Sequence, residues 1–341
     1  MVLALNQIHH GDARVLLKEV EKDSIACSIW SPPYHVGKDY EKEMSFQEWR
    51  SLLKEVIKLH FPIIKPGGFI AINIADILCF RDEAIPRIQA MNVKRQIPSI
   101  TREKVFTAMK EHPNYDRYQL AKVLGCSEQT VDRRLHGNNV RGGKYNTQTR
   151  VQLVGGIIEE AGVDAGLYLY DRRIWVKDPA WQNSKWHTLS YRSVDEFEYI
   201  YIFWKPGVSV INRGRLSREE WRNWGSRGVW FFPSVRANDT HEAKFPLELP
   251  RRLIRLLTDE DETVLDPFMG SGTTAIAALQ ENRNFIGIEL SEKYVELGRA
   301  ACKREAEMRR TRQLPMENGT FDEQIMKNTQ LKLLGEVSLS K

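Results

Sequence analysis

Four residues near the start of the chain combine a rigid backbone with hydrogen-bonding and stacking groups. They form the tetrapeptide Ser31-Pro32-Pro33-Tyr34, which directly follows the apolar run Ser24–Trp30. Proline fixes its own φ angle and keeps the preceding residue extended, so this loop presents the Ser31 hydroxyl and its own carbonyls rigidly. Tyr34 adds a flat face on which another ring can stack. Taken alone, the string also fits a strand-ending turn or a proline-rich ligand motif.

A glycine-rich turn forms the second group with chemical potential. The segment Thr263–Gln280 places Gly270 and Gly272 between a predicted strand and a predicted helix. Glycines let a ligand approach the backbone, and a helix N-terminus offers free N–H groups, although glycines also simply close tight turns. No lysine follows Gly272, so the triphosphate-binding loop pattern is absent. Glu289 ends the next predicted strand, where an acid can hold the hydroxyls of a ribose.

These strings resemble one family. Asp266-Pro-Phe-Met-Gly-Ser-Gly-Thr-Thr274 resembles the S-adenosylmethionine-binding motif of the amino-methylating DNA methyltransferases, and Ser31–Tyr34 resembles their catalytic tetrapeptide. The order, with the catalytic loop first and the cofactor motif last, is that of the β group of this family. The resemblance covers about residues 1–90 and 160–305, which leaves 91–150 as an insertion.

The resemblance implies a set of contacts to S-adenosyl-L-methionine. It assigns Asp266 and the following turn to the methionine portion, Glu289 to the ribose and Asp12 to the adenine. The segment His241–Pro246 resembles a block that closes the methionine pocket. The cofactor-binding residues implied in this way are Asp12, Asp266, Pro267, Phe268, Gly270, Ser271, Gly272, Thr273, Glu289, His241, Phe245 and Pro246.

The resemblance also implies a reaction at Ser31, Pro32, Pro33 and Tyr34. An exocyclic amino nitrogen donates its lone pair into the base and is therefore a poor nucleophile. Hydrogen bonds accepted by Ser31 and by a loop carbonyl would return this lone pair to the nitrogen, which then attacks the sulfonium methyl group. The base must first leave the duplex, and Tyr34 would stack on it.

The first residue of the tetrapeptide bears on the identity of the methylated base. Family members with Asp or Asn there mostly modify adenine N6, whereas Ser accompanies mainly cytosine N4. Ser31 therefore favours cytosine N4, with adenine N6 as the alternative, and neither reaction needs a metal. Methylation of RNA or protein also stays open. A helix-turn-helix regulator on an inactive methyltransferase scaffold is a further hypothesis, against which the two intact motifs argue.

Basic charge gathers in two segments of a chain whose net charge is only +5. Residues 91–150 contain 12 Lys and Arg against 5 Asp and Glu, and residues 205–240 contain 7 against 3. Such blocks suggest contact with a polyanion, here double-stranded DNA, although ordinary solvated surfaces can have the same composition.

The first basic segment contains a predicted pair of helices around Gly125. The apolar pattern predicts a helix over 118–124 and a second one over 128–135, capped by Ser127. The pair resembles a helix-turn-helix, whose second helix reads DNA. Its predicted DNA-binding residues are Ser127, Gln129, Thr130, Arg133 and Arg134. The alternative is a helical insertion whose glycine merely ends a helix.

The second basic segment, residues 206–240, is the predicted target-recognition region. Five arginines there can reach guanine edges or phosphates: Arg213, Arg215, Arg218, Arg222 and Arg227. Five aromatic residues can either wedge at the flipped base or pack a small subdomain: Trp221, Trp224, Trp230, Phe231 and Phe232.

The elements that must position these groups alternate between strands and helices. Apolar runs predict strands over 24–30, 69–74, 167–176, 197–204, 263–265 and 284–289. Helical spacing predicts helices over 46–59, 249–257 and 274–280, with a turn at Lys65–Gly68. This alternation predicts an α/β fold with a doubly wound, mostly parallel sheet, interrupted by the helical insertion. The family resemblance implies that the sheet is of the Rossmann-like methyltransferase type in permuted order.

The predicted domain division follows these features. It comprises a catalytic half (1–90), the basic helical insertion (91–150), a continued methyltransferase domain (151–205), the target-recognition region (206–240), a cofactor-binding half (241–312) and a polar tail (313–341).

Several classes of protein are disfavoured by composition. No apolar run approaches the roughly 18 residues of a membrane span, and the first residues lack the basic start of a signal peptide. The 4 cysteines lie far apart without a CxxC pair, which argues against a zinc cluster or a disulfide framework. We therefore expect a cytoplasmic enzyme that a cognate restriction endonuclease can accompany. The oligomeric state does not follow from the sequence.

Overall fold

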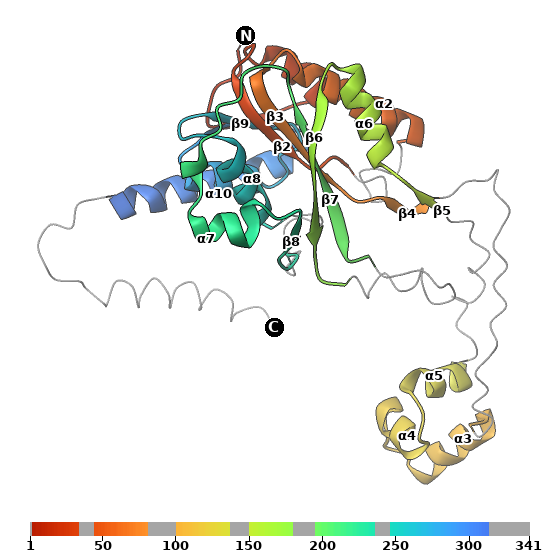
Figure 1. Ribbon diagram of the computed structural model, residues 1–341. Coiled ribbons are helices and arrows are strands. Elements are labelled where there is room, and N and C mark those ends of the chain that lie inside the picture. The colour runs from red at the N-terminus through yellow and green to blue at the C-terminus, as the bar shows by residue number, and fades with distance from the viewer. Residues whose placement is uncertain are drawn as a thin grey trace, which may run out of the picture.

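The computed structural model describes residues 2–33, 44–80, 100–136, 150–179, 195–235 and 246–313. Its largest unit is an eight-stranded sheet in the order β1-β10-β9-β2-β3-β7-β6-β8, with helices on both faces (Figure 1). The strands from β1 to β3 run parallel, and β7 runs antiparallel to both of its neighbours. The predicted doubly wound, mostly parallel sheet is confirmed.

The strands of this sheet are β1 (Gln7–His10), β2 (Ile25–Trp30), β3 (Ile64–Ile74), β6 (Tyr168–Val176), β7 (Phe197–Trp204), β8 (Val229–Phe231), β9 (Thr263–Asp266) and β10 (Asn284–Glu289). The helices around it are α1 (Ala13–Leu16), η1 (Leu17–Glu19), α2 (Phe46–His60), α6 (Gly155–Asp164), η5 (Arg213–Arg215), α7 (Arg218–Glu220), η6 (Trp221–Gly225), α8 (Glu248–Leu257), α9 (Thr273–Gln280) and α10 (Glu292–Gln313).

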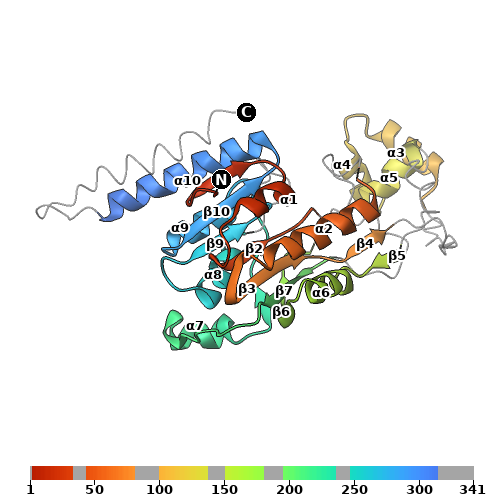
Figure 2. The ribbon, with the colours of Figure 1, turned by 90° about the horizontal axis from the view of Figure 1, so that it is seen from above.

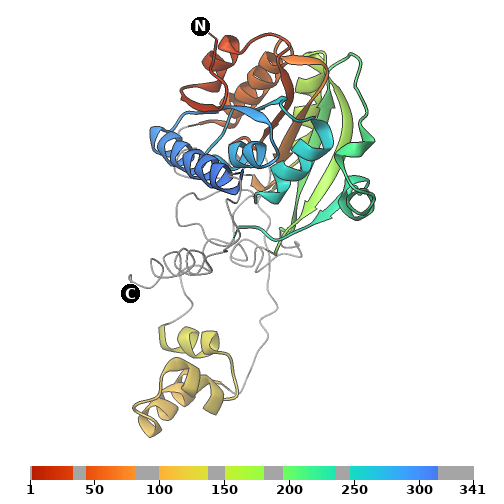
Figure 3. The same cartoon turned by 90° about the vertical axis from the view of Figure 1, so that its left-hand side faces the viewer.

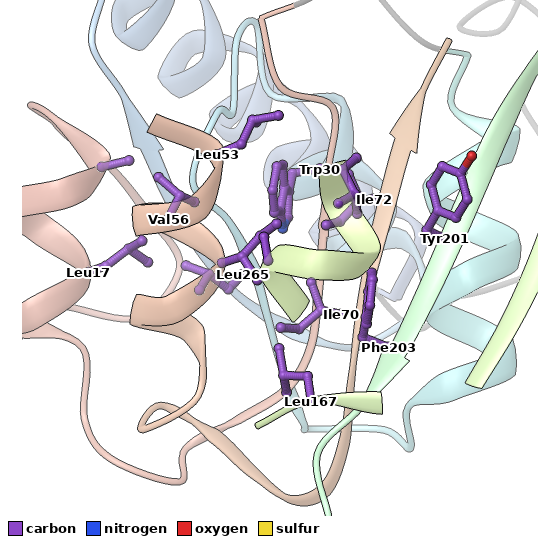
Figure 4. Packing of buried hydrophobic residues seen from close by; sticks show 14 of the residues in the cluster. Leu17, Trp30, Leu53, Val56, Ile70, Ile72, Leu167, Tyr201, Phe203 and Leu265 are labelled. Carbon is purple, nitrogen blue, oxygen red and sulfur yellow. The ribbon is translucent and has the colours of Figure 1, made fainter. Parts of the chain in front are cut away.

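Two apolar layers hold the helices against the sheet. Helices α2 and α6 lie side by side on one face (Figure 2), where Leu53 and Val56 pack around Trp30 (Figure 4). Helices α8, α9 and α10 pack together on the other face (Figure 3). All six residues of β2 are buried because both faces of this central strand are covered.

The turn predicted at Lys65–Gly68 is wrong in part, because these residues lie inside β3. The pairing of β3 with β2 jumps there, from Ile25 opposite Ile64 to Cys27 opposite Phe69. Gly67 has a φ of 82°, and a Cβ atom at this position would lie 2.2 Å from the Val208 carbonyl oxygen. The two glycines therefore form a bulge within a strand rather than a connection between elements.

The inserted helices build an apolar cluster of their own. Helices α3 (Arg102–Glu111), α4 (Arg117–Val123) and α5 (Glu128–His136) enclose Val105, Leu120 and Val131, and Figure 1 shows them as a separate group. The chain leaves the sheet through β4 (Ile77–Phe80) and returns through β5 (Arg150–Gln152), which pair antiparallel. The insertion thus begins and ends at one point of the fold.

The helices predicted around Gly125 are both present as α4 and α5. Gly125 has a φ of 61° in the turn that joins them. Asp116 starts α4 as a capping box with Gln119. Helix α3 also lies in the segment predicted to be helical. By contrast, the sequence patterns did not predict β1, α6 or the long helix α10, and residues 314–341 of the predicted tail lie outside the described ranges.

Candidate active site

The predicted catalytic and cofactor residues meet at one edge of the sheet. Ser31 follows β2, Asp266 ends the adjacent strand β9, and Glu289 ends β10, which lies beside β9. Asp12 follows β1, next to β10. All four strands are parallel, so their carboxyl ends face the same side, where ligands of open α/β sheets bind.

Asp266 is a buried acid with two donors already bound. Its Oδ1 accepts from the Phe268 N–H at 2.9 Å, and its Oδ2 accepts from the Thr274 hydroxyl at 2.6 Å. Burial raises the pKa of Asp266 to about 7, and the nearby charge of Glu289 acts in the same direction. The acid is therefore poised to ionise when a cation is placed against it.

The glycine turn connects Asp266 to helix α9. Pro267 is buried and Phe268 is half-buried, while Ser271 and Thr273 are partly exposed where α9 begins. Gly272 has a φ of 95°, and a Cβ atom there would lie 3.2 Å from the Cα of Gly298 in α10. Only glycine suits this backbone, which brings the start of α9 close to α10.

Glu289 fastens the same turn. Its carboxylate accepts one hydrogen bond from the Gly270 N–H and another from the Ser291 N–H, each 2.8 Å long. A carboxylate offers about four acceptor positions, so hydroxyl groups of a ligand can still bind. The Glu289 carbonyl also accepts from the Gly11 N–H at 3.0 Å, which places Asp12 beside this acid.

Asp12 itself has local partners. It caps α1 by accepting from the Arg14 N–H at 2.8 Å, and it binds the Arg14 guanidinium through both carboxylate oxygens. The Arg14 hydrogen bonds lower the pKa of Asp12. The structure brings Asp12 to the predicted site, and its contact with adenine stays a prediction.

The catalytic loop touches the cofactor turn. The rings of Trp30 and Phe268, one from each segment, have centroids 5.5 Å apart. Pro32 is buried, and Ser31 and Pro33 are partly exposed. Tyr34 lies outside the described residues, as do His241 and Phe245, whereas Pro246 accepts from the Leu249 N–H at the start of α8.

Trp49 on α2 holds the catalytic loop, a role that the sequence did not predict. Its indole N–H donates to the Pro33 carbonyl at 2.6 Å, and its side chain is fully buried. Phe46 stacks on the Trp49 ring at 5.5 Å. The helical spacing predicted only that Trp49 lies on the apolar face of α2, so no sequence signal separated this residue from ordinary core residues.

A second buried contact links α2 to two strands below the loop. The Ser28 hydroxyl lies 2.9 Å from His60 Nε2 and 3.2 Å from the Leu265 carbonyl of β9. His60 Nδ1 donates to the Val56 carbonyl at 2.7 Å, so His60 Nε2 is an acceptor and shares the single Ser28 hydroxyl hydrogen with the Leu265 carbonyl. Burial lowers the pKa of His60 to about 4, so the ring is neutral.

The predicted recognition region separates into exposed and engaged arginines. Arg213, Arg218 and Arg222 are exposed on η5, α7 and η6, and Arg227 is exposed in the turn after η6. Arg215 instead binds both carboxylate oxygens of Asp259 at 2.7 Å and donates to the Leu256 carbonyl. The Arg215 guanidinium therefore holds the region against the end of α8, and its contact with DNA stays a prediction.

The aromatic residues of this region mostly pack. Trp224 and Trp230 are buried edge to face, and the Arg252 guanidinium of α8 lies over both rings and over Phe232. Trp221 is half-buried, whereas Phe231 is 70% exposed. The subdomain interpretation therefore holds for the tryptophans, and Phe231 is the exposed aromatic side chain.

The residues predicted to read DNA from the insertion lie on or just before α5. Gln129 and Arg133 are exposed, and the Ser127 hydroxyl lies 3.0 Å from that of Thr130. Arg134 is exposed as well, but its Nε donates to the Ile100 carbonyl at 2.8 Å. Part of its guanidinium is therefore used to hold α5 against the segment before α3.

Comparison with known proteins identifies the family. Residues 25–300 match the model of the N6/N4 DNA methylases. The chain belongs to this DNA methylase family. M.BglI of Bacillus subtilis, described as a Type II methyltransferase, is 63% identical over 295 residues, which span 86% of this chain and 85% of that protein. The methylase family takes its methyl group from S-adenosylmethionine.

Two solved structures share the methylase fold. TTHA0409 from Thermus thermophilus, a putative DNA modification methylase in complex with S-adenosylmethionine, has a TM-score of 0.57 at 23% identity, covering 88% of this chain and 93% of that one. The cytosine-N4-specific PvuII DNA methyltransferase has a TM-score of 0.57 at 16% identity, covering 98% and 94%.

The described residues fit S-adenosylmethionine. Asp266 supplies a buried carboxylate whose raised pKa suits a neighbouring cation, and Glu289 keeps acceptor positions for hydroxyl groups. The described ranges contain no group of three or more His, Cys, Asp or Glu side chains arranged to bind a metal ion. In the same ranges, every helix is too short or too polar to cross a membrane.

Proposed function

We propose that this protein is a site-specific DNA methyltransferase that transfers a methyl group from S-adenosylmethionine to the N4 amino group of a cytosine in duplex DNA. The observation that carries the proposal is the meeting of two loops. The Ser31 loop follows β2, the Asp266–Thr274 turn follows the adjacent β9, and Trp30 contacts Phe268 between them. This neighbourhood of the two loops supports a reaction in which an acceptor for an amino group acts beside the bound methyl donor.

The cofactor supplies an electrophilic methyl group, and the loop prepares the nucleophile. The Pro33 carbonyl already accepts the Trp49 indole N–H, so we assign the second acceptor to the Pro32 carbonyl. Ser31 and Pro32 would then accept the two amino hydrogens of the flipped base. The nitrogen lone pair, freed from the ring, would form the new N–CH3 bond while the S–CH3 bond of the sulfonium breaks and its electron pair stays on sulfur as a neutral thioether. One amino proton then passes to solvent.

Ser31 supports cytosine as the methylated base, because serine at this position accompanies mainly N4 methylation. The family model spans both N6 and N4 methylases, so adenine N6 is the competing outcome. The relative M.BglI is described as a Type II methyltransferase. We therefore place the enzyme in a restriction–modification setting, with a cognate endonuclease as its expected companion.

The test is transfer of tritium from labelled cofactor to DNA, followed by separation of the nucleosides. Labelled N4-methylcytosine supports the proposal. Labelled N6-methyladenine would show that the enzyme methylates an amino group of DNA, but on adenine rather than cytosine. Absence of label across varied duplexes, with cofactor binding intact, would favour a regulator on an inactive scaffold. Competition with RNA and with protein separates the remaining substrate classes.

Ser31→Ala tests the role of the tetrapeptide. Transfer should fall by about a hundredfold or more, while the dissociation constant of S-adenosylmethionine changes less than about threefold. Equal loss of transfer and of cofactor binding would show that Ser31 merely supports the fold.

We further propose that the exposed arginines Arg213, Arg218, Arg222 and Arg227 contact DNA. Each neutralised phosphate releases about one counterion, so each Arg→Gln change should lower the salt dependence of DNA affinity by a slope of about 0.9. Arg215→Gln is the matched control, because its guanidinium binds Asp259. If none of the four variants changes the slope of DNA affinity against salt concentration, the DNA does not contact these arginines.

The helices of the insertion are proposed as a second DNA contact. Gln129 and Arg133 stand exposed on α5, the helix that would enter the major groove. The double change Gln129→Ala and Arg133→Ala should weaken affinity for the recognised sequence at least about tenfold more than affinity for unrelated duplex. An equal loss on both duplexes would mean that α5 reads no sequence.

A further inference from the structure

Serine differs from aspartate and asparagine in one respect that matters for the proposed reaction. A side-chain carbonyl or carboxylate oxygen only accepts hydrogen bonds, whereas a hydroxyl also carries a hydrogen of its own. For Ser31 to accept from the amino group, its own hydrogen must point to a different acceptor. The present inference rests on the proposed function and concerns this second acceptor.

Asn73 on β3 carries a buried oxygen that is suited to the task. The residue is 1% exposed, and its Nδ2 donates to the Tyr199 carbonyl of β7 at 3.1 Å. This bond fixes the orientation of the amide, so Oδ1 points the other way. Within the described part of the chain, Asn73 Oδ1 is buried and accepts no hydrogen bond. Buried polar atoms of this kind are rare and call for an explanation.

The strand register places Asn73 next to Ser31. Strands β2 and β3 run parallel, with Ile29 opposite Ala71 and Trp30 opposite Ile72. The next pair in this register is Ser31 and Asn73, at the usual strand spacing of about 4.8 Å. Pro32 keeps Ser31 extended, so the alternation of side chains continues into the loop.

Ser31 and Asn73 also share one face of the sheet. Ile29 and Ala71 belong to the apolar cluster on the side of α8, and Trp30 and Ile72 belong to the cluster on the side of α2. Alternation therefore directs the following pair toward the α8 side. The register and the alternation therefore direct both side chains to the same face at the carboxyl edge of the sheet.

A charged cluster around Lys177 lies near this end of β7. Lys177 Nζ binds Glu198 at 2.6 Å and Asp195 at 3.1 Å. Glu198 lies two residues before Ile200, which is the β7 partner of Asn73. Lys177 thus satisfies Glu198 and Asp195, whereas the Asn73 oxygen keeps its acceptor capacity.

We propose that Asn73 is a positioning residue for methyl transfer. With the target base bound, the Ser31 hydroxyl donates its hydrogen to Asn73 Oδ1, and the Ser31 lone pairs face the amino group of the base. Asn73 touches neither the base nor the methyl donor and acts through Ser31. It enables a serine to serve as the pure acceptor that aspartate or asparagine provides directly.

The test is a double-mutant cycle measured by single-turnover methyl transfer. Asn73→Ala in the Ser31 enzyme should slow transfer by about tenfold or more. The same change should cost less than about threefold in the Ser31→Ala background, where no hydroxyl needs orienting. If the Ser31→Asn enzyme is active, Asn73→Ala should likewise cost it less than about threefold in transfer. Equal losses in all backgrounds would overturn the proposal and leave Asn73 as a tie between β3 and β7.

Asn73→Asp tests the acceptor oxygen separately from the hydrogen bond that Asn73 Nδ2 donates to the Tyr199 carbonyl. This variant keeps an oxygen for Ser31 and loses the amide donor to Tyr199, so it should retain transfer within about threefold if the acceptor matters. A loss as large as that of Asn73→Ala would contradict the proposal. Ile72→Val is the packing control on the other face of β3 and should show no coupling to Ser31. Methyl transfer by the enzyme without substitutions is measured first. If it transfers no methyl group to DNA, the proposed function fails, and this outcome is distinct from a failure of the Asn73 proposal.

Discussion

Asp266 shows how a single side chain can be prepared for a charged ligand. Burial opposes its ionisation, while the Thr274 hydroxyl and the Phe268 N–H partly compensate, and the pKa lies at about 7. The charged form is therefore costly in the free protein and becomes favourable when a cation lies against it. The methionine portion of S-adenosylmethionine carries such a cation in its ammonium group.

This environment predicts that cofactor affinity depends on pH. We predict that the ionised Asp266 carboxylate binds the ammonium group, so affinity should fall by about tenfold per pH unit below about 7 and level off above it. Isothermal calorimetry between pH 5.5 and about 8.5 measures this profile. Asp266→Asn should bind more weakly and almost independently of pH; the same pH profile in that variant would contradict the assignment.

Trp49 sets the position of the catalytic loop through one hydrogen bond. Trp49→Phe keeps an aromatic ring against Phe46 and leaves the Pro33 carbonyl without its donor. We expect a loss of about 1–3 kcal/mol in unfolding free energy and a similar penalty on methyl transfer. Chemical denaturation and single-turnover kinetics measure the two effects. Phe46→Leu is the packing control, because it leaves the indole donor in place, and equal kinetic effects would argue against the role of the hydrogen bond.

Among the elements, α2 links the helical layer to the loop at Ser31–Pro33 and to strands β2 and β9. Ser45 and Glu48 start this helix as a capping box, Trp49 binds the catalytic loop, and His60 at its last turn binds Ser28 of β2. Ser28 also reaches the Leu265 carbonyl of β9. Both strands that carry the site are therefore joined at the end of α2, and a shift of this helix would move them together.

The neutral His60 predicts acid sensitivity of this arrangement. Its folded pKa of about 4 lies below the usual 6.5, so the unfolded chain binds more protons between these values. The unfolding free energy should therefore decrease by up to about 3 kcal/mol as the pH falls from about 6.5 to about 4. Denaturation across this range, compared with His60→Gln, isolates the effect. An identical pH slope in both proteins would refute it.

At the scale of the whole molecule, the insertion is attached where β4 and β5 pair. Its described helices, residues 100–136, contain 7 basic and 5 acidic residues. Much of the positive balance of residues 91–150 therefore lies in the segments that flank these helices. The apolar cluster of α3, α4 and α5 is built from their own residues, so the sheet does not depend on it for its core.

Removal of the insertion is therefore expected to spare the cofactor site. A chain in which a short turn joins Phe80 to Arg150 should bind S-adenosylmethionine within about threefold of the full chain and lose at least about tenfold in DNA affinity. Calorimetry and DNA titration at fixed salt measure the two quantities. Unchanged DNA affinity and specificity would mean that the insertion is structural.

The sequence by itself determined the core strands and the two motifs of this protein. Buried parallel strands appear as continuous apolar runs, so 24–30 and 284–289 were recognisable without any partner. The strings Ser31–Tyr34 and Asp266–Thr274 are local, because each forms one strand-ending loop. Their adjacency comes from the sheet, in which β2 pairs with β9.

Only the tertiary structure decided which side chains support those motifs. Trp49, His60 and Asn73 sit in apolar or alternating patterns that predict burial and nothing more. Their roles arise from contacts across long stretches of chain, such as that between Ser28 and Leu265, which are 237 residues apart. In the sequence Arg215 is indistinguishable from its exposed neighbours, and only the structure shows that it binds Asp259 in the segment after α8. A hydrogen bond depends on the position of both partners, and that position is set by packing of the whole sheet.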